Sequence, residues 1–342
     1  MSRAQSLSPA AVERLPILII LRLALPKLGV AYLFTLLLSV FNRVMINELH
    51  IAATLIGGLY FAYRIMNIFQ VYVGRYSDRR MLFGLRRTPF VAGGLLLAAL
   101  SLVPLPYLAV AYSQQPNVIY LALMLLCMLG FGFGFAANGD AQNTLIAEMT
   151  EGKKNRPAVV ATVWLFQIVF IVISGIASSI ILQIADTQAG APPSCTTAEC
   201  AAIRSRVAVE MMPKFFLAGP LVSLVGLLPL IGVERRVRVD ETQPVVARPQ
   251  LDARQAYARI FSNSQARVFF FFVVMAIFAL FLQDSILEPF GADVFKLAPH
   301  QTAQFQPIMG VGTIVAMLIT GALASWKPIP KRTIADFGLL IA

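Results

Sequence analysis

Four charged residues lie at the ends of two apolar segments that are far apart in the sequence. Arg43 and Glu48 lie near the end of the first segment, and Asp284 and Glu288 lie near the end of a much later one. Opposite charges at two segment ends can pair across a molecule, and breaking such a pair can release one conformation for another. We interpret these four residues as candidates for a gate between two halves of the protein. Solvated helix ends are the alternative interpretation.

Arg64 lies inside the second apolar segment. An arginine near a helix centre costs about 2.5–3.5 kcal/mol on membrane-insertion scales, so it must face a bundle interior or reach toward the membrane edge. Either a cavity residue that meets a polar ligand or a structural ion pair would satisfy this requirement. Carboxamides in or near the apolar segments are further candidates for ligand contact: Asn67, Gln70, Asn138, Gln167 and Gln283.

The stretch 74–89 is polar and separates two long apolar segments. Its five arginines cannot lie in hydrocarbon, so it is predicted to be a tight loop at one membrane face. An aspartate in such a loop can accept hydrogen bonds from the free N–H groups at a helix start. The residues expected to matter in this loop are Gly74, Asp78, Arg79, Arg80, Gly84, Arg86 and Arg87.

Few residues in the sequence could hold a metal ion. The chain has two histidines, His50 and His300, which are expected in loops at the membrane edge, and three scattered cysteines. This scatter argues against a zinc or haem site, and no phosphate-binding loop is present. Cys195 and Cys200 lie in a predicted loop, where they can form a disulfide in an oxidising compartment. We therefore predict no enzymatic activity and no metal site.

The composition predicts an all-α polytopic membrane protein. Of the 342 residues, 58% are hydrophobic and 13% are charged, whereas soluble domains carry about 25% charge. The net charge of +11 would suggest nucleic acid as a partner of a soluble protein. In a membrane protein the enrichment of lysine and arginine in cytoplasmic loops explains it better. We therefore expect the lipid bilayer, and not a nucleic acid, as the surroundings of this chain.

Apolar segments divide the chain into four parts: a polar and interfacial segment 1–27, a six-segment bundle 28–233, a charged linker 234–265 and a partial bundle 266–342. The predicted segments are 28–45, 54–73, 90–112, 118–137, 159–184, 215–233, 268–287 and 305–324. A ninth begins near Arg332 and has about half of the roughly 20 residues that a spanning helix needs. We therefore expect a chain truncated at its C-terminus after about eight and a half transmembrane helices.

The charges also predict an orientation. Most of the 28 lysines and arginines fall before segment 1, in the loops after segments 2 and 4, and in the linker. Positively charged loops remain in the cytoplasm, so the N-terminus and the linker are expected there.

The polar loop resembles a motif of the major facilitator superfamily. The superfamily pattern G-x-x-x-D-R-x-x-x-G-R-R can be read with one extra residue as Gly74, Asp78, Arg79, Gly84, Arg86 and Arg87. Six segments before a charged linker and a repeat after it are similar to the six-plus-six helix plan of that superfamily.

Three further stretches resemble the PucC/LhaA family more specifically. Residues 42–49 read NRVMINEL, residues 283–291 read QDSILEPFG, and residues 132–137 read GFGFAA before an AEMT stretch at 147–150 and Trp164. Asn47 and the residues after Gly291 depart from the family pattern. The resemblance covers most of residues 20–325.

The resemblance implies an assembly factor for the light-harvesting antenna complexes of photosynthetic bacteria. It implies bacteriochlorophyll as cargo, antenna polypeptides and pigment-synthesis proteins as partners, and a bacterial cytoplasmic or photosynthetic membrane as location; a homo-oligomer is compatible with it. A cation-coupled transporter of a small solute is the alternative, and a passive subunit of a membrane complex is a third hypothesis. The scarcity of polar side chains in segments 3, 6 and 8 favours an apolar ligand or a protein partner.

Overall fold

The computed structural model describes residues 14–234, 258, 261–282 and 286–325. Within these ranges the regular elements are helices, with one isolated bridge between Leu82 and Leu85. The prediction of a polytopic all-α membrane protein is therefore confirmed. Six helical runs in the described residues are long and apolar enough to cross a membrane: Ile17–Glu48, Thr88–Gln114, Val118–Met149, Arg156–Gln188, Ala198–Leu230 and Pro299–Thr320.

The first candidate span consists of four short helices: α1 (Ile17–Ala24), α2 (Lys27–Thr35), η1 (Leu36–Phe41) and η2 (Val44–Glu48). α1 and α2 meet at Pro26, which lacks the N–H that would continue the helical ladder. The last two helices are π-helical, a form that frequently marks functional sites. The run begins at Ile17, so the residues expected to form a separate interfacial helix extend this span.

The second apolar segment forms three consecutive helices: α3 (Ala53–Ile65), the 3-10 helix η3 (Met66–Phe69) and α4 (Gln70–Arg79). Gly74 and Asp78, which were expected in a loop, lie within α4. Because no proline interrupts this stretch, the helix continues past the apolar residues into the polar ones. The loop that remains is 80–87, and Gly84 adopts a positive φ of 75° in its turn, where a side chain would be strained.

Segment 3 is broken at a proline. α5 (Thr88–Leu102) and α6 (Leu105–Gln114) are separated at Pro104. Three long helices follow: α7 (Val118–Met149), α8 (Arg156–Gln188) and α9 (Ala198–Leu227), the last extended by the turn η4 (Leu228–Leu230). α9 begins inside the predicted loop because the Thr197 side chain accepts a hydrogen bond from the Cys200 N–H and caps the helix there.

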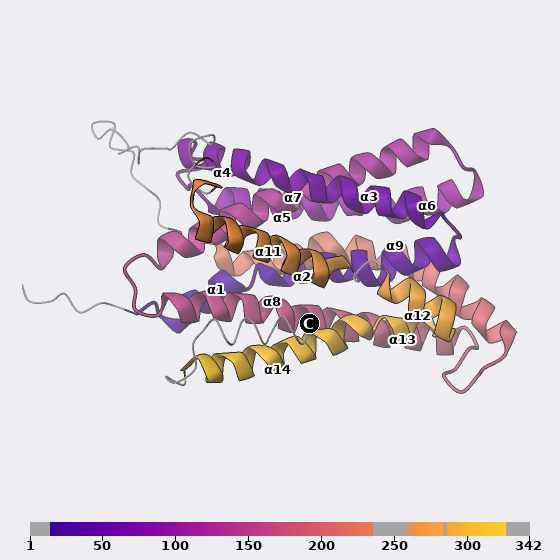
Figure 1. Ribbon diagram of the computed structural model, residues 1–342. Helices are drawn as coiled ribbons and strands as arrows, with labels where there is room; N and C mark the ends of the chain where they lie inside the picture. Colours follow the sequence, from indigo (N-terminus) through magenta and orange to yellow (C-terminus); the bar gives the residue numbers. More distant parts are fainter. Residues whose placement is uncertain (1–13, 235–257, 259–260, 283–285, 326–342) are drawn as a thin grey trace, which may run out of the picture.

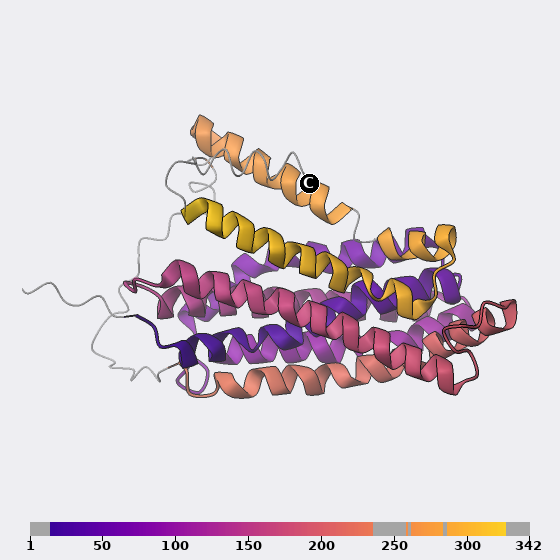
Figure 2. The same cartoon turned by 90° about the horizontal axis from the view of Figure 1, so that it is seen from below.

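The later part of the chain forms four described helices: α11 (Ser264–Leu282), α12 (Leu287–Phe295), α13 (Pro299–Thr302) and α14 (Phe305–Ser325). α11 accounts for the predicted segment 7 as far as Leu282, where this described range stops, and α12 is a short helix outside the six candidate spans. α11 and α14 lie on one side of the bundle (Figure 2). The ninth segment and most of the linker lie outside the described residues.

Glycines bring α5 and α7 into direct backbone contact. A Cβ atom on Gly94 would lie 2.6 Å from the backbone nitrogen of Asn138, and one on Gly134 would lie 2.6 Å from the backbone nitrogen of Ala98. Only the absence of side chains permits this approach, as is common between helices in membranes. Gly94 and Gly134 therefore serve helix packing.

The ends of the bundle differ in what they contain. α12, α13 and the loop that leads into α9 lie at one end, and the end of α4 and the start of α8 lie at the other (Figure 1). Between the ends, large apolar side chains such as Phe61, Ile68 and Tyr72 are exposed along α3–α4. This apolar exterior suits contact with lipid.

Candidate functional site

Arg43 connects the first candidate span to the later part of the chain. Its guanidinium donates one hydrogen bond of 2.7 Å to the Thr302 hydroxyl and another of 2.9 Å to the backbone carbonyl of Leu297. It also forms an ion pair with Glu48, with a nitrogen–oxygen distance of 3.3 Å. Both charged side chains are almost completely buried. An arginine with three partners on two elements can hold those elements together.

Glu288 is the second connection between these elements. Its side chain accepts a 2.7 Å hydrogen bond from the Ser39 hydroxyl, and the residue is fully buried. Its other carboxyl oxygen, Oε2, has no hydrogen-bond partner among the described residues. Burial raises the pKa of the Glu288 carboxyl to about 8, although the Ser39 hydrogen bond and the Arg43 charge act to lower it. At the rim, Asn47 donates a 2.5 Å hydrogen bond to Asp293.

A third connection joins α8 to α13. His300 Nδ1 lies 3.1 Å from an Asp186 carboxyl oxygen, and the Ser179 hydroxyl donates a 2.7 Å hydrogen bond to the His300 carbonyl. The sequence places His300 in a loop at the membrane edge, and this is wrong, because the residue is buried and lies in α13 at the start of a candidate span. His50 lies between η2 and α3, in a loop as expected, and is exposed.

We call these contacts the polar junction, defined by Ser39, Arg43, Asn47, Glu48, Asp186, Glu288, Asp293, His300 and Thr302. The chain turns sharply near the junction, and this turn sets the direction of its side chains. Lys296 ends α12 in a left-handed conformation with φ 55°, and Pro299 then begins α13. Gly291 packs against the Phe305 ring, where an added Cβ would lie 2.7 Å from a ring carbon. These features turn the chain so that Glu288 and Thr302 face the same span.

Three of the four predicted gate residues therefore belong to one junction. Arg43 and Glu48 pair within the first span, and Glu288 reaches Ser39 of the same span. The fourth, Asp284, lies outside the described residues. That these residues form a gate remains a prediction, because a gate has an open and a closed conformation and the structure shows a single conformation.

The predicted polar loop forms a separate cluster at the other end of the bundle. Arg87 is buried and donates hydrogen bonds to the Glu148 carboxylate at 2.8 Å and to the Ser77 hydroxyl at 2.6 Å. The Glu234 carboxylate accepts hydrogen bonds from the backbone N–H groups of Arg86, Arg87 and Thr88. Glu234 thus caps the N-terminus of α5, a role that the sequence suggested for an aspartate.

The other loop residues contribute less to this cluster. Gly74 lies in α4, where an added Cβ would be 2.7 Å from Asp140 of α7, so it permits close helix packing. Arg80 is exposed, and Gly84 forms the turn. The side chains of Asp78 and Arg79 lie outside the described part of the chain, so their roles remain predictions.

The candidate ligand residues fall into different surroundings. Arg64 is half-buried, with its guanidinium carbon 5.4 Å from the centre of the Tyr63 ring. Asn138 is buried and donates to the Val91 carbonyl, so its N–H group serves helix packing. Asn67 is exposed.

Gln70 and Gln167 are the other two predicted ligand residues that the structure describes. Gln70 is half-buried beside Gly139 of α7. Gln167 has a buried side-chain oxygen without a hydrogen-bond partner among the described residues. Gln283 lies outside those residues. Gln167 is therefore the candidate with the most evident unused hydrogen-bonding capacity.

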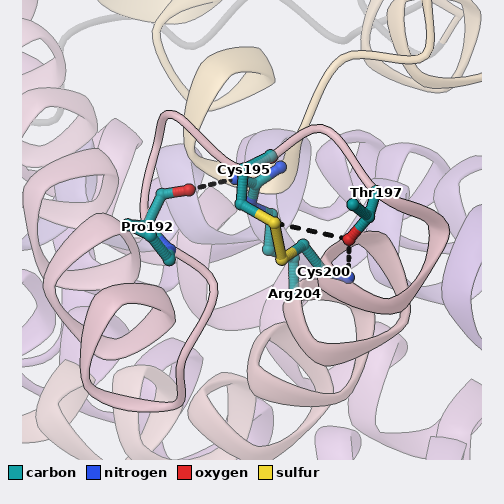
Figure 3. Close-up of a disulfide and its surroundings, with 5 residues drawn as sticks. All are labelled: Pro192, Cys195, Thr197, Cys200 and Arg204. Atoms are coloured by element: carbon teal, nitrogen blue, oxygen red, sulfur yellow. Dashed lines mark hydrogen bonds between the residues drawn. A yellow bond between two sulfur atoms is a disulfide. The ribbon is translucent and has the colours of Figure 1, made fainter.

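Cys195, in the loop before α9, forms a disulfide with Cys200 in the first turn of α9 (Figure 3). Arg204 donates hydrogen bonds to the carbonyls of Pro192 and Cys195, which fixes the loop against the helix. In the described residues there is no group of three or more histidine, cysteine, aspartate or glutamate side chains that could hold a metal ion. A crevice of about 370 Å³ lies between α8 and α14, with Ser179, Gln183 and Gln304 among its lining residues.

Comparison with known proteins identifies the family. The family described as PUCC protein matches residues 40–342, which is most of the chain and includes the polar loop and every residue of the polar junction except Ser39. The chain belongs to the PUCC family. The family resemblance seen in residues 42–49, 132–150 and 283–291 is thereby confirmed.

Individual PUCC relatives are distant. The chain is 28% identical over 309 residues to the bacteriochlorophyll synthase 44.5 kDa chain of Rhodobacter capsulatus, covering 90% of this chain and 64% of that protein. It is 23% identical over 313 residues to protein PucC of Rhodovulum sulfidophilum, covering 90% of this chain and 64% of the relative. An uncharacterized protein of the puhA-bchM intergenic region of Rhodobacter capsulatus is 24% identical over 337 residues, with shares of 97% and 65%. The chain thus spans slightly less than two thirds of the length of these relatives.

The sequence did not predict several residues of this PUCC site. Ser39, Asp186, Thr302 and Glu234 were not singled out, because a serine, a threonine or a single carboxylate at a segment end is common in any membrane protein. Glu234 follows directly after segment 6, so its position at the start of the linker was a usable signal for a helix cap. Asp186, in contrast, became informative only when α13 was placed beside α8.

Proposed function

We propose that this protein is a membrane assembly factor for bacterial light-harvesting antenna complexes and that it binds bacteriochlorophyll for delivery. The observation that carries the proposal is the PUCC family match over residues 40–342. One relative is named as a bacteriochlorophyll synthase chain, which supports pigment as a ligand class. We further propose that the chain itself has no catalytic role and that antenna polypeptides and pigment-synthesis proteins are its partners.

The helix arrangement supports the major facilitator plan for this function. Six segments precede the linker, and α11 and α14 would be the seventh and eighth. In such a plan the two halves meet along their first helices. Here Arg43 of the first span bonds to Thr302, and Ser39 of the same span bonds to Glu288. We propose that the polar junction lies between the two halves and closes the site from one side of the membrane.

The disulfide supports the orientation expected from the charges. Cys195–Cys200 lies at the end of the bundle that carries α12 and α13, away from the loop that carries Arg86 and Arg87. Disulfides persist in oxidising compartments, whereas arginine-rich loops remain in the cytoplasm. We therefore propose a bacterial photosynthetic membrane location with the N-terminus and the polar loop in the cytoplasm.

We propose Gln167 as an oxygen ligand for the pigment magnesium. Magnesium prefers oxygen donors, and the buried side-chain oxygen of Gln167 is without a partner among the described residues. His300, in contrast, is already engaged by Asp186. A single carboxamide ligand would hold pigment weakly enough for transfer to another protein.

The experiment is purification of the tagged chain from a bacteriochlorophyll-making host that lacks its own family member. Absorbance per protein measures bound pigment, and antenna absorbance of the cells measures assembly. We expect pigment to co-purify, Gln167→Leu to lose most of it, and Gln183→Leu, a matched carboxamide on the same helix, to keep it. Protein that restores no antenna and carries no pigment, but moves a small solute in vesicles, would establish the transporter alternative instead.

A further inference from the structure

The polar junction has an unequal number of buried acids and bases. Arg43 is buried and its charge is already matched by Glu48, at 3.3 Å. Glu288 is a second carboxyl in the same junction, and none of its surface is exposed to solvent. If both carboxyls were ionised, one buried negative charge would lack a counter-charge, which is costly in a region without water. The closed junction is electrically balanced only when Glu288 carries a proton.

The groups around Glu288 do not change this balance. From the first span, Arg43 and Glu48 face the junction, together with the neutral Ser39 hydroxyl. From α3, the Tyr60 hydroxyl interacts electrostatically with Glu288 and donates its hydrogen bond to the Leu37 carbonyl. Arg64 of the same helix acts electrostatically on Tyr60, whereas the positive charge that acts on the Glu288 carboxyl is that of Arg43.

The remaining neighbouring elements do not change the balance either. On α12, Asp293 is exposed at the rim and accepts a hydrogen bond from Asn47, and Lys296 is exposed at the end of the helix. On α13, His300 is paired with Asp186 of α8. Asp284 precedes the junction in the sequence and lies outside the described residues. The variant Asp284→Asn therefore tests whether this carboxyl contributes to the pH dependence.

We propose that Glu288 is a proton-binding site that controls the junction between the first span and α12–α13. The protonated carboxyl keeps the junction closed. Release of one proton from Glu288 to water leaves a carboxylate, and two carboxylates then compete for the single guanidinium of Arg43. When α12 and α13 separate from the first span, the junction opens and water can solvate the carboxylate. This proton dependence is independent of which cargo the protein carries.

The direction of the pH effect follows from linkage. The buried carboxyl has a raised pKa of about 8, and once hydrated in an open junction its pKa falls toward the ordinary range of about 4–4.5. The closed form therefore binds the proton more tightly than the open form. Between those two pKa values, each unit of rising pH shifts the equilibrium toward the open form by as much as tenfold. Above about pH 8 the shift is complete.

The oxygen Oε2 gives this titration a structural basis. In the described residues it has no hydrogen-bond partner, so an added proton can reside there without displacing the Ser39 hydrogen bond to Oε1. The Ser39 donor favours the ionised form. Removing it should make ionisation harder and move the opening to higher pH.

The test is a distance measurement on the full chain in lipid nanodiscs between pH 5 and pH 9. Spin labels on His50→Cys and Lys296→Cys, two exposed positions on opposite sides of the junction, report its opening; Cys127→Ser removes the free thiol. Infrared spectroscopy of the same samples follows the protonated carboxyl band. We expect the separated population to grow as pH rises, together with loss of that band.

Variants identify the carboxyl. Glu288→Gln should remain closed at all pH values and lack the band, and Ser39→Ala should shift the midpoint upward. Asp293→Asn, a matched change of an exposed acid on the same helix, and Asp284→Asn should leave the midpoint in place. A Glu288→Gln protein that opens with the wild-type pH dependence overturns the proposal, and so does an invariant wild-type distance. If Glu288→Gln does not fold, Ser39→Ala decides: a midpoint pH that stays the same or moves downward in this variant also overturns the proposal.

Discussion

The polar junction and the cluster around Arg87 both place a buried arginine beside carboxylates, but at opposite ends of the bundle. Arg87 has Glu148 and Ser77 as partners, and all of them belong to the first six segments. Arg43 instead bonds to Thr302 and to the Leu297 carbonyl, which lie more than 250 residues later in the sequence. The first arginine thus holds one bundle together, and the second holds two distant parts of the chain together.

The carboxylates of the two clusters differ as well. Glu148 keeps 42% of its side chain exposed, and Glu234 uses its oxygens to cap three backbone N–H groups. Glu288 is fully buried and makes one hydrogen bond. A cluster whose charges are solvated or capped is stable in one arrangement. A cluster with an excess buried carboxyl is stable only in one protonation state, which is a requirement for a switch.

The largest effect is expected from breaking the Arg87 cluster. Glu148→Leu leaves the buried Arg87 guanidinium without this half-exposed carboxylate, and loss of a hydrogen bond to a charged group costs about 1.5–3 kcal/mol. Unfolding in a denaturing detergent, followed by circular dichroism, measures the change. Glu148→Gln retains an acceptor and should lose less. Equal stability of Glu148→Leu and the wild type would show that this end of the bundle does not depend on the pair.

A smaller effect is expected from Glu234→Ala. The change removes the cap of α5, and loss of a helix N-cap costs about 1–2 kcal/mol. Burial acts to raise the pKa of Glu234, but the N–H donors of Thr88, Arg87 and Arg86 hold it below its ordinary value. Its contribution to stability is therefore present above the ordinary pKa of about 4.3 and is lost as pH falls through the folded-state value.

The same unfolding assay at several pH values tests this assignment. The difference in stability between wild type and Glu234→Ala should shrink below about pH 4. Glu151→Ala, which changes an exposed carboxylate at the same end, is the matched control. A difference that stays constant with pH would mean that Glu234 acts by packing and not by its charge.

The smallest effect is expected at the rim of the junction. Asn47→Ala removes one exposed hydrogen bond to Asp293, and such bonds contribute about 0.5–1.5 kcal/mol at most. The spin-label distance and its midpoint pH should hardly change, in contrast to Ser39→Ala deeper in the junction. A large response to Asn47→Ala would place the controlling contact at the rim and not at Glu288.

The sequence predicted most of the helices because hydrocarbon imposes a simple rule. Apolar runs of about 20 residues mark spanning helices, so the long helices α7 and α8 could be expected. The break at Pro104 has a different cause, because proline lacks the N–H that continues a helix. The ends of helices were less predictable. α4 continues through Gly74 to Arg79, and α9 begins at Ala198, because polar residues at a membrane face are equally compatible with helix and loop.

By itself, the sequence determined the membrane class, the family and the identity of three junction residues. Charges inside or beside apolar segments are costly, and that cost made Arg43, Glu48 and Glu288 conspicuous. Only the tertiary structure decided their partners. Ser39, Asp186, Thr302 and the carbonyl of Leu297 carry no sequence signal of their own, since a hydroxyl or a carbonyl becomes a ligand only when folding buries it within hydrogen-bond distance of a charge.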